Sequence, residues 1–135
     1  MGGQPRLAPG ELFAERFEIR RHAGAGGMSL VYAAHDRQSG QAVALKVLHG
    51  DRASAARFVR EVWVLSELHH PAIVRYVAHG TTALGQAWLA MEWLDGEDLA
   101  ERLARAPLTA AEAVILAERV AAALAAAHAA GVVHR

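Results

Sequence analysis

The stretch VALK, residues 43–46, decides the fold, because it places Lys46, the only lysine of the chain, on an apolar segment. Arginine supplies every other basic residue among the 14 Lys and Arg, so this lysine marks a site that suits a compact ammonium better than a planar guanidinium. The apolar run around Lys46 lies between Gly40 and Gly50 and predicts a buried β-strand. A lysine on a buried strand needs a nearby anion, and the alternative is a strand-end lysine that reaches solvent.

The composition is that of one ordinary globular domain. The chain has 135 residues, of which 53% are hydrophobic and 21% are charged. Basic and acidic residues balance at 14 each, so no charge excess indicates nucleic acid as a partner. The lack of cysteine excludes disulfides and thiolate metal sites and agrees with a cytoplasmic location. No stretch has the apolar length of a signal peptide or a membrane span, so we expect neither export nor a membrane segment.

A glycine-rich stretch, GAGGMSLVY at residues 24–32, separates two predicted strands. The first strand, around Phe17 and Ile19, runs into a turn at Gly24, and the second, residues 30–34, precedes another turn. Clustered glycines expose backbone N–H groups, which suits a loop folded over phosphates. A dinucleotide-binding unit would need a helix directly after this loop, whereas the following residues predict a β-hairpin. A glycine-rich hairpin turn without a ligand is the alternative.

Residues 53–68 predict a helix, because their apolar residues recur at helical spacing and Pro71 prevents continuation. Glu61 falls inside the apolar face of that helix, so we expect its carboxylate to point inward. A buried carboxylate must be neutralised or paired, and Lys46 is the partner that the sequence offers. The alternative is that Glu61 lies at the edge of the apolar face and reaches water.

Two further strands, residues 73–78 and 87–91, complete a predicted five-stranded antiparallel sheet with one helix. His69 and His70 precede the first of them. Adjacent histidines point in different directions, and no other ligand lies at metal-binding spacing, so we predict no metal site.

Beyond the last strand the sequence changes to a polar connector, EWLDGEDL, and then to helices. Asp98 is placed to cap a short helix, and Thr109 with Glu112 forms a capping box for a long Ala-rich helix that runs to about residue 130. The long helix has a broad apolar surface, so we expect it to need neighbours.

These parts, in this order, resemble the first half of a protein kinase domain, and most resemble bacterial Ser/Thr kinases of the eukaryotic-like type. The motifs that carry the resemblance are GAGGMSLVY, VALK, the helix with its inward glutamate, HPAIVRY, MEWL and GVVHR. The resemblance implies an α+β fold: a kinase N-lobe with a five-stranded antiparallel sheet plus one helix, a hinge, and the first helices of an incomplete C-lobe. The implied boundaries are a flexible tail at 1–12, the N-lobe at 13–91, the hinge at 92–98 and the start of the C-lobe at 99–135.

The implied activity is ATP-dependent phosphoryl transfer to protein Ser or Thr, with ATP and magnesium as cofactors. Lys46 and Glu61 are the implied catalytic residues: Lys46 would hold the α- and β-phosphates, and Glu61 would position it. This agrees with the independent argument from lysine usage and helix face. The implied nucleotide-binding residues also include the glycine loop, the adenine slot, the hinge and a ribose contact: Ala23, Gly24, Ala25, Gly26, Gly27, Met28, Ser29, Val31, Ala44, Met91, Glu92, Leu94 and Asp98.

The resemblance assigns further roles around the adenine. Val31 and Ala44 would sandwich the base, Met91 would be the gatekeeper, and the backbone of Glu92 and Leu94 would hydrogen-bond it. The resemblance also implies a hydrophobic stack that joins the lobes of active kinases, with members Leu65, Tyr76 and His134.

The chain departs from the kinase pattern at three places. Ser29 replaces the third glycine of the loop, and Ala23 stands where a larger aliphatic residue usually covers the adenine. The chain ends at His134 and Arg135, the first two residues of a His-Arg-Asp motif, so the catalytic aspartate and the magnesium ligands would lie beyond it.

We therefore expect the 135-residue chain alone to be an inactive fragment of a longer kinase. None of its motifs defines the protein substrate. One alternative is a non-catalytic nucleotide- or partner-binding module that self-associates through its exposed long helix. Another is a remnant that aggregates because part of its core is missing.

Overall fold

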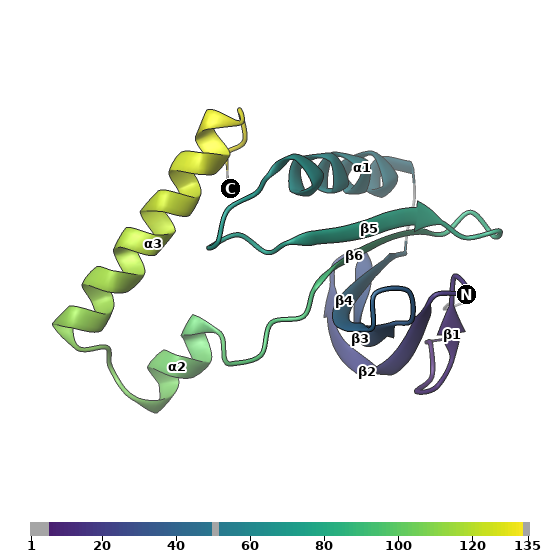
Figure 1. The fold of residues 1–135 in the computed structure, drawn as a ribbon, viewed down its shortest axis with the longest axis horizontal. Helices are drawn as coiled ribbons and strands as arrows, with labels where there is room; N and C mark the ends of the chain where they lie inside the picture. The colour runs from purple at the N-terminus through teal and green to yellow at the C-terminus, as the bar shows by residue number, and fades with distance from the viewer. Residues whose placement is uncertain (1–5, 50–51, 134–135) are drawn as a thin grey trace.

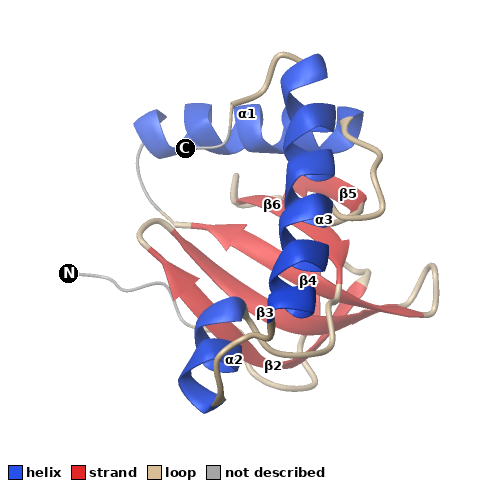
Figure 2. Cartoon of the chain, turned by 90° about the vertical axis from the view of Figure 1, so that its left-hand side faces the viewer, coloured by secondary structure: helices blue, strands red, loops and turns tan. Residues whose placement is uncertain are grey.

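The computed structural model describes residues 6–49 and 52–133. Its elements, in chain order, are β1 (Leu12–Phe13), β2 (Phe17–Gly26), β3 (Ser29–Asp36), β4 (Gln41–Leu48), α1 (Arg52–Glu67), β5 (Tyr76–Thr81), β6 (Ala87–Glu92), α2 (Leu99–Arg105) and α3 (Ala110–Ala129). The strands form one antiparallel sheet in the order β1-β2-β3-β4-β6-β5. Helix α1 lies along one side of the sheet, and α2 and α3 lie beside the sheet (Figure 1 and Figure 2). The α+β class agrees with the sequence prediction.

Strand β4 shows how the sheet divides its two faces. Val43, Leu45 and Val47 are buried in a core that includes the aromatic side chains of Phe17, Tyr32 and Trp88. Ala44, Lys46 and Leu48, which alternate with them, lie on the other face and are only partly buried. The predicted buried strand is therefore fully buried on one face only, because the second face borders a cleft.

The sheet has six strands rather than the predicted five. The additional strand, β1, pairs with β2, and Phe13 enters the core with 5% of its surface exposed. Just before it, the Gly10 N–H donates to the Ile19 carbonyl at 2.7 Å. Gly10 and Leu12, in the last part of the segment predicted as a flexible tail over residues 1–12, therefore lie against the sheet, because burial of Phe13 draws the preceding backbone onto it; residues 1–5 lie outside the described residues.

The strand predicted at residues 73–78 begins later, at Tyr76, and continues to Thr81. A turn delays its start: the Ile73 N–H donates to the His70 carbonyl at 3.0 Å, and His70 Nδ1 accepts the Ala72 N–H at 3.0 Å. These local hydrogen bonds compete with sheet pairing, so the apolar run does not become a strand over its full length.

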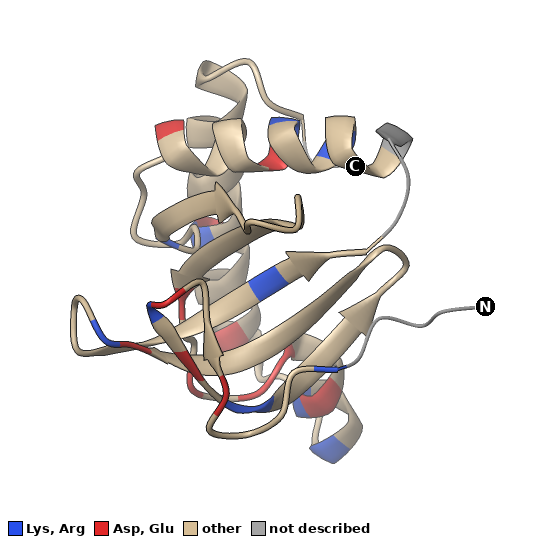
Figure 3. Ribbon diagram, turned by 90° about the vertical axis from the view of Figure 1, so that its right-hand side faces the viewer, with Lys and Arg blue, Asp and Glu red and all other residues tan. Residues whose placement is uncertain are grey.

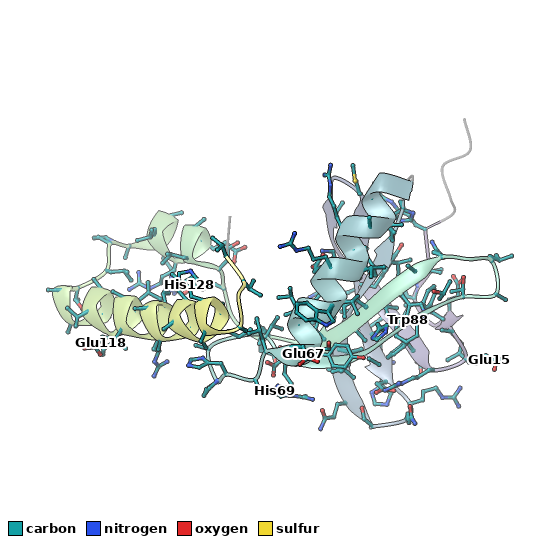
Figure 4. All side chains as sticks on the ribbon, turned by 90° about the horizontal axis from the view of Figure 1, so that it is seen from above. Glu15, Glu67, His69, Trp88, Glu118 and His128 are labelled. Carbon is teal, nitrogen blue, oxygen red and sulfur yellow. The ribbon has the colours of Figure 1, made fainter. Side chains whose placement is uncertain are left out.

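Both predicted helix caps are present. The side chains of Asp98 and Thr109 accept the N–H groups of Glu101 and Glu112, and each pair completes a capping box. In the described residues of α2 none is buried, and in α3 only Ala127 is. Figure 4 shows the side chains of α3 standing apart from the sheet, in line with the expected apolar surface.

Within the residues that the structure describes, no helix has the length and apolarity needed to cross a bilayer.

Candidate functional site

The site is built around an ion pair between the sheet and α1. Lys46 Nζ on β4 lies 2.6 Å from Glu61 Oε1 and 2.9 Å from Glu61 Oε2 on α1. The predicted contact between the two side chains is confirmed. Their burial is less complete than expected, since the side chains of Lys46 and Glu61 are 23% and 39% exposed. Both alternatives given for Glu61 therefore hold in part: its carboxylate pairs with Lys46, and it is also exposed to water at the edge of the apolar helix face.

The strand register places the predicted adenine residues beside this pair. Val31 lies opposite Lys46, and Ala44 lies opposite Met91. Directly opposite residues of antiparallel strands share a face of the sheet, as do alternate residues along one strand. Val31, Ala44, Lys46 and Met91 consequently lie on one face, the face that α1 borders.

The glycine loop closes one side of the site. Strand β2 continues to Gly26 rather than turning at the predicted Gly24, and Gly27 with Met28 forms the turn into β3. The hydroxyl of Ser54 on α1 donates to Met28 Sδ, which links the loop to the helix. The loop is thus the tip of a β-hairpin that reaches the start of α1.

A cavity of about 230 Å³ lies between the loop, β4 and α1. Its lining residues are Gly26, Gly27, Met28, Ser29, Lys46, Leu48, Ser54, Arg57, Phe58 and Glu61. Figure 3 shows basic positions on β4 and α1. Sequence reasoning did not single out Arg57, although its spacing of one helical turn from Glu61 is a signal that could have found it. Ala23 and Ala25 are exposed on β2 and do not line this cavity.

The glycines at the cavity are not required by the chain itself. Neither Gly26 nor Gly27 has a positive φ. A Cβ at Gly27 would meet nothing within 4 Å, and one at Gly26 would make only an ordinary contact of 3.6 Å with Ser29 Oγ. Missing side chains here leave open space beside exposed backbone and an ammonium, an arrangement that fits a phosphate ligand.

Glu92, the last residue of β6, anchors the start of the segment that follows this strand. Glu92 Oε1 accepts the Arg75 N–H at 2.7 Å, and the Glu92 N–H donates to the Arg75 carbonyl at 2.9 Å. Leu94 is 66% exposed, and Asp98 Oδ1 accepts the Glu101 N–H at 2.8 Å in the cap of α2. Glu92 is therefore tied to Arg75, Leu94 is exposed, and one carboxylate oxygen of Asp98 is already used in the cap; the roles predicted for these residues in nucleotide binding stay predictions.

A second, larger cavity of about 910 Å³ lies between α1, residues 72–74 and α3. Glu61 and Leu65 of α1 and Met91 of β6 line one side of it, and mainly apolar residues of α3 line the other. Leu65 and Tyr76 both pack against the buried cluster of Phe58, Val62 and Leu89, whereas His134, the third predicted member of their stack, lies outside the described residues.

Metal ligands do not gather in the part of the chain that the structure describes: no group of three His, Asp or Glu residues there could hold an ion. No described residue is therefore assigned to magnesium.

Residues 17–135 match the protein kinase domain family, so the chain belongs to that family. Its relatives include bacterial Ser/Thr protein kinases. The chain is 40% identical over 134 residues to serine/threonine-protein kinase pkn2 of Myxococcus xanthus, a match that covers 96% of this chain and 16% of pkn2. It is 41% identical over 133 residues to PknJ of Mycobacterium tuberculosis, covering 96% of this chain and 22% of PknJ.

The fold is also that of a solved kinase domain. The crystal structure of the Mycobacterium tuberculosis PknI kinase domain aligns with a TM-score of 0.79 at 34% identity and covers 96% of this chain. The match covers 54% of the PknI chain, so this chain spans about half of that domain and under a quarter of pkn2 or PknJ. The predicted kinase fold is confirmed.

Proposed function

We propose that this chain is the ATP-binding part of a Ser/Thr protein kinase and that the nucleotide phosphates occupy the cavity between the glycine loop and Lys46. The observation that carries the proposal is the placement of the Lys46–Glu61 pair on a cavity walled by Gly26 and Gly27. Glu61 holds the ammonium in one place, and the glycines leave backbone N–H groups uncovered. Together they offer fixed positive charge to a polyphosphate.

The remaining site residues receive the following roles in the proposal. Val31 and Ala44 form the apolar floor under the adenine, with Met91 behind it. The backbone of Glu92 and Leu94 binds the base edge. Asp98 accepts from the ribose through its second carboxylate oxygen.

Bound magnesium would neutralise charge on the transferred phosphoryl group.

Phosphoryl transfer to a protein Ser or Thr belongs to the longer kinase, because pkn2 and PknJ, which are named Ser/Thr protein kinases, extend far beyond the matched part. In such a longer protein we expect Lys46→Met to abolish phosphorylation, because the α- and β-phosphates lose their cation. Retained autophosphorylation in that variant would contradict the assignment. The cytoplasmic location and the domain boundaries stay predictions.

The test is an NMR titration of the ¹⁵N-labelled chain with ATP, ADP, AMP and adenosine, which measures even millimolar affinities. We expect shifts at residues 26–29 and at Lys46, and affinity that rises with the number of phosphates. In Lys46→Met that rise should disappear. The control is Arg20→Met, which removes a charge from a side chain that is 58% exposed and pairs with Glu18. A glycine loop unaffected by ATP would overturn the proposal.

A second candidate is a non-catalytic module that self-associates through α3. The observation that favours it is the exposure of large apolar side chains on this helix, with Val114, Ile115 and Val120 at 57%, 51% and 48%. Sedimentation velocity tests it, since a monomer at high concentration would exclude it.

A further inference from the structure

A cation–π contact joins β2 to the segment after β6. The Cζ atom of Arg21 lies 5.2 Å from the ring centroid of Trp93. The indole N–H of Trp93 donates to Asp95 Oδ1 at 3.0 Å. The indole is thus held by a guanidinium at its ring and by a carboxylate at its N–H, so it connects two parts of the chain that are far apart in sequence.

The register shows that Arg21 belongs to the face of the proposed nucleotide site. Arg21 lies opposite Ala33, Ala33 opposite Ala44, and Ala44 opposite Met91, which makes one row across four strands. The next residue, His22, packs edge-on against the buried Tyr32, with ring centroids 5.7 Å apart. Since neighbouring residues of a strand point to opposite faces, this contact places Arg21 on the face away from the core.

The row has small residues in its middle and large ones at its ends. Ala33 and Ala44 contribute only methyl groups, so the middle of the row, here called the slot, is low between the larger side chains of Met91 and Arg21. Trp93 lies two residues beyond Met91 and reaches the Arg21 end. The stacked pair therefore lies at the Arg21 end of the slot.

We propose that Arg21 is a positioning residue of this slot and that its stacking on Trp93 sets the width available to a planar purine base. The inference rests on the proposed function, because it takes the slot to be the adenine site. Arg75 holds Glu92 on one side of Trp93, and Arg21 holds the indole itself. The backbone at Glu92 and Leu94 is thereby kept at a fixed distance from β2.

A different role for Arg21 would be to attract phosphates by its charge, and the two roles predict different ligand dependence. A residue that sets the base slot affects adenosine, AMP and ADP equally. A residue that attracts phosphates has little effect on adenosine and a growing effect as phosphates are added. The dependence of the loss of affinity on the number of phosphates therefore distinguishes a positioning role of Arg21 from an electrostatic one.

The experiment measures dissociation constants for adenosine, AMP and ADP by NMR on the parent chain, Arg21→Ala, Trp93→Leu and the double variant. We expect each single variant to weaken all three ligands by about threefold, the scale of an exposed cation–π contact. The double variant should be no weaker than the singles, because both remove the same contact. The control is Arg20→Ala, which makes the same charge change beside the site and should bind like the parent.

The contact itself is checked without nucleotide. The chain has three tryptophans, so Arg21→Ala should move one of three indole N–H signals, the one lost in Trp93→Leu. Circular dichroism confirms that the variants fold, and Arg21→Lys, which keeps the charge but lacks the planar group, should weaken all three ligands by an intermediate amount.

Three results would overturn the inference. Unchanged dissociation constants in Arg21→Ala, with normal binding by the parent, would remove the positioning role and leave the proposed function intact. A loss confined to AMP and ADP would make Arg21 a phosphate-attracting residue instead. No binding of any ligand by the parent chain would overturn the inference together with the proposed function.

Discussion

Lys46 Nζ contacts both carboxylate oxygens of Glu61, at 2.6 and 2.9 Å, although the two residues lie 15 positions apart in the chain. The pair bridges β4 and α1 beside Phe58 and Val62, the buried residues by which the helix packs on the sheet. The ammonium therefore keeps its place only while α1 is docked. Its position is thus coupled to packing of the helix.

Glu61→Gln should lower ATP affinity while leaving the stability of the fold nearly unchanged. Because both side chains are partly exposed, we expect the free energy of unfolding to fall by less than about 1 kcal/mol. ATP affinity should fall severalfold, because the ammonium loses its fixed position. Urea unfolding and an ATP titration measure the two effects. A large loss of stability with unchanged ATP affinity would make the pair a structural one.

Gly27→Ala tests whether the loop is built for a ligand. The Cβ would meet nothing within 4 Å and the backbone φ is not positive, so stability should change by less than about 0.5 kcal/mol. ATP affinity should nevertheless decrease, because the methyl group occupies space beside the phosphates. Gly40→Ala is the matched control: its φ of +74° makes alanine destabilising by about 1 kcal/mol. Equal ATP affinity in Gly27→Ala and the parent would favour a hairpin turn without a ligand.

The ion pair of Arg16 and Asp36 should make stability depend on acid pH. Arg16 donates to both carboxylate oxygens of Asp36 at 2.7 Å, and the side chain of Asp36 is fully buried. The Arg16 hydrogen bonds, helped by those of Ser39 and the Gln38 N–H, hold the pKa of Asp36 well below its ordinary value of 3.8. A lowered folded pKa means that this stabilisation is complete above that ordinary value and is lost as the pH falls towards the folded pKa.

Asp36→Asn provides the measurement for this pair. At pH 7 the variant should lose on the order of 3 kcal/mol of unfolding free energy, because the guanidinium of Arg16 loses its counterion. The difference from the parent should shrink below about pH 4. Urea unfolding from pH 7 to pH 3 gives both values, and a difference independent of pH would show that the charge of Asp36 is not what stabilises the fold.

Asp98 has two candidate roles, the N-cap of α2 and a contact to the ribose, and the Asp98→Ser variant distinguishes them. Its carboxylate caps α2 by accepting the Glu101 N–H, and serine is an equally good N-cap. We expect Asp98→Ser to keep the stability of the parent and to bind adenosine more weakly, because the ribose loses its acceptor. Asp98→Ala should lose both the helix cap and the ribose contact, and its free energy of unfolding should fall by about 1 kcal/mol. Unchanged adenosine affinity in Asp98→Ser would leave Asp98 with the cap alone.

Features that depend on nearby residues could be predicted from the sequence. The caps at Asp98 and Thr109 act on groups three residues away, and helical spacing directed Glu61 toward the sheet. The single lysine identified the other half of the pair. The start of β5 could not be predicted from its apolar run, because the turn at His70 competes with the sheet for the same backbone.

By itself the sequence determined the helices and their caps, the strands other than β1 in their order, and the residue types of the proposed nucleotide site, because these depend on spacing within a few residues. Only the tertiary structure decided that Phe13 adds a strand to the sheet, that Asp36 takes Arg16 as its partner, and that Arg21 stacks on Trp93. Each of those contacts joins different elements of the fold. Such contacts exist only once strand register has brought the partners together, and no local pattern records that register.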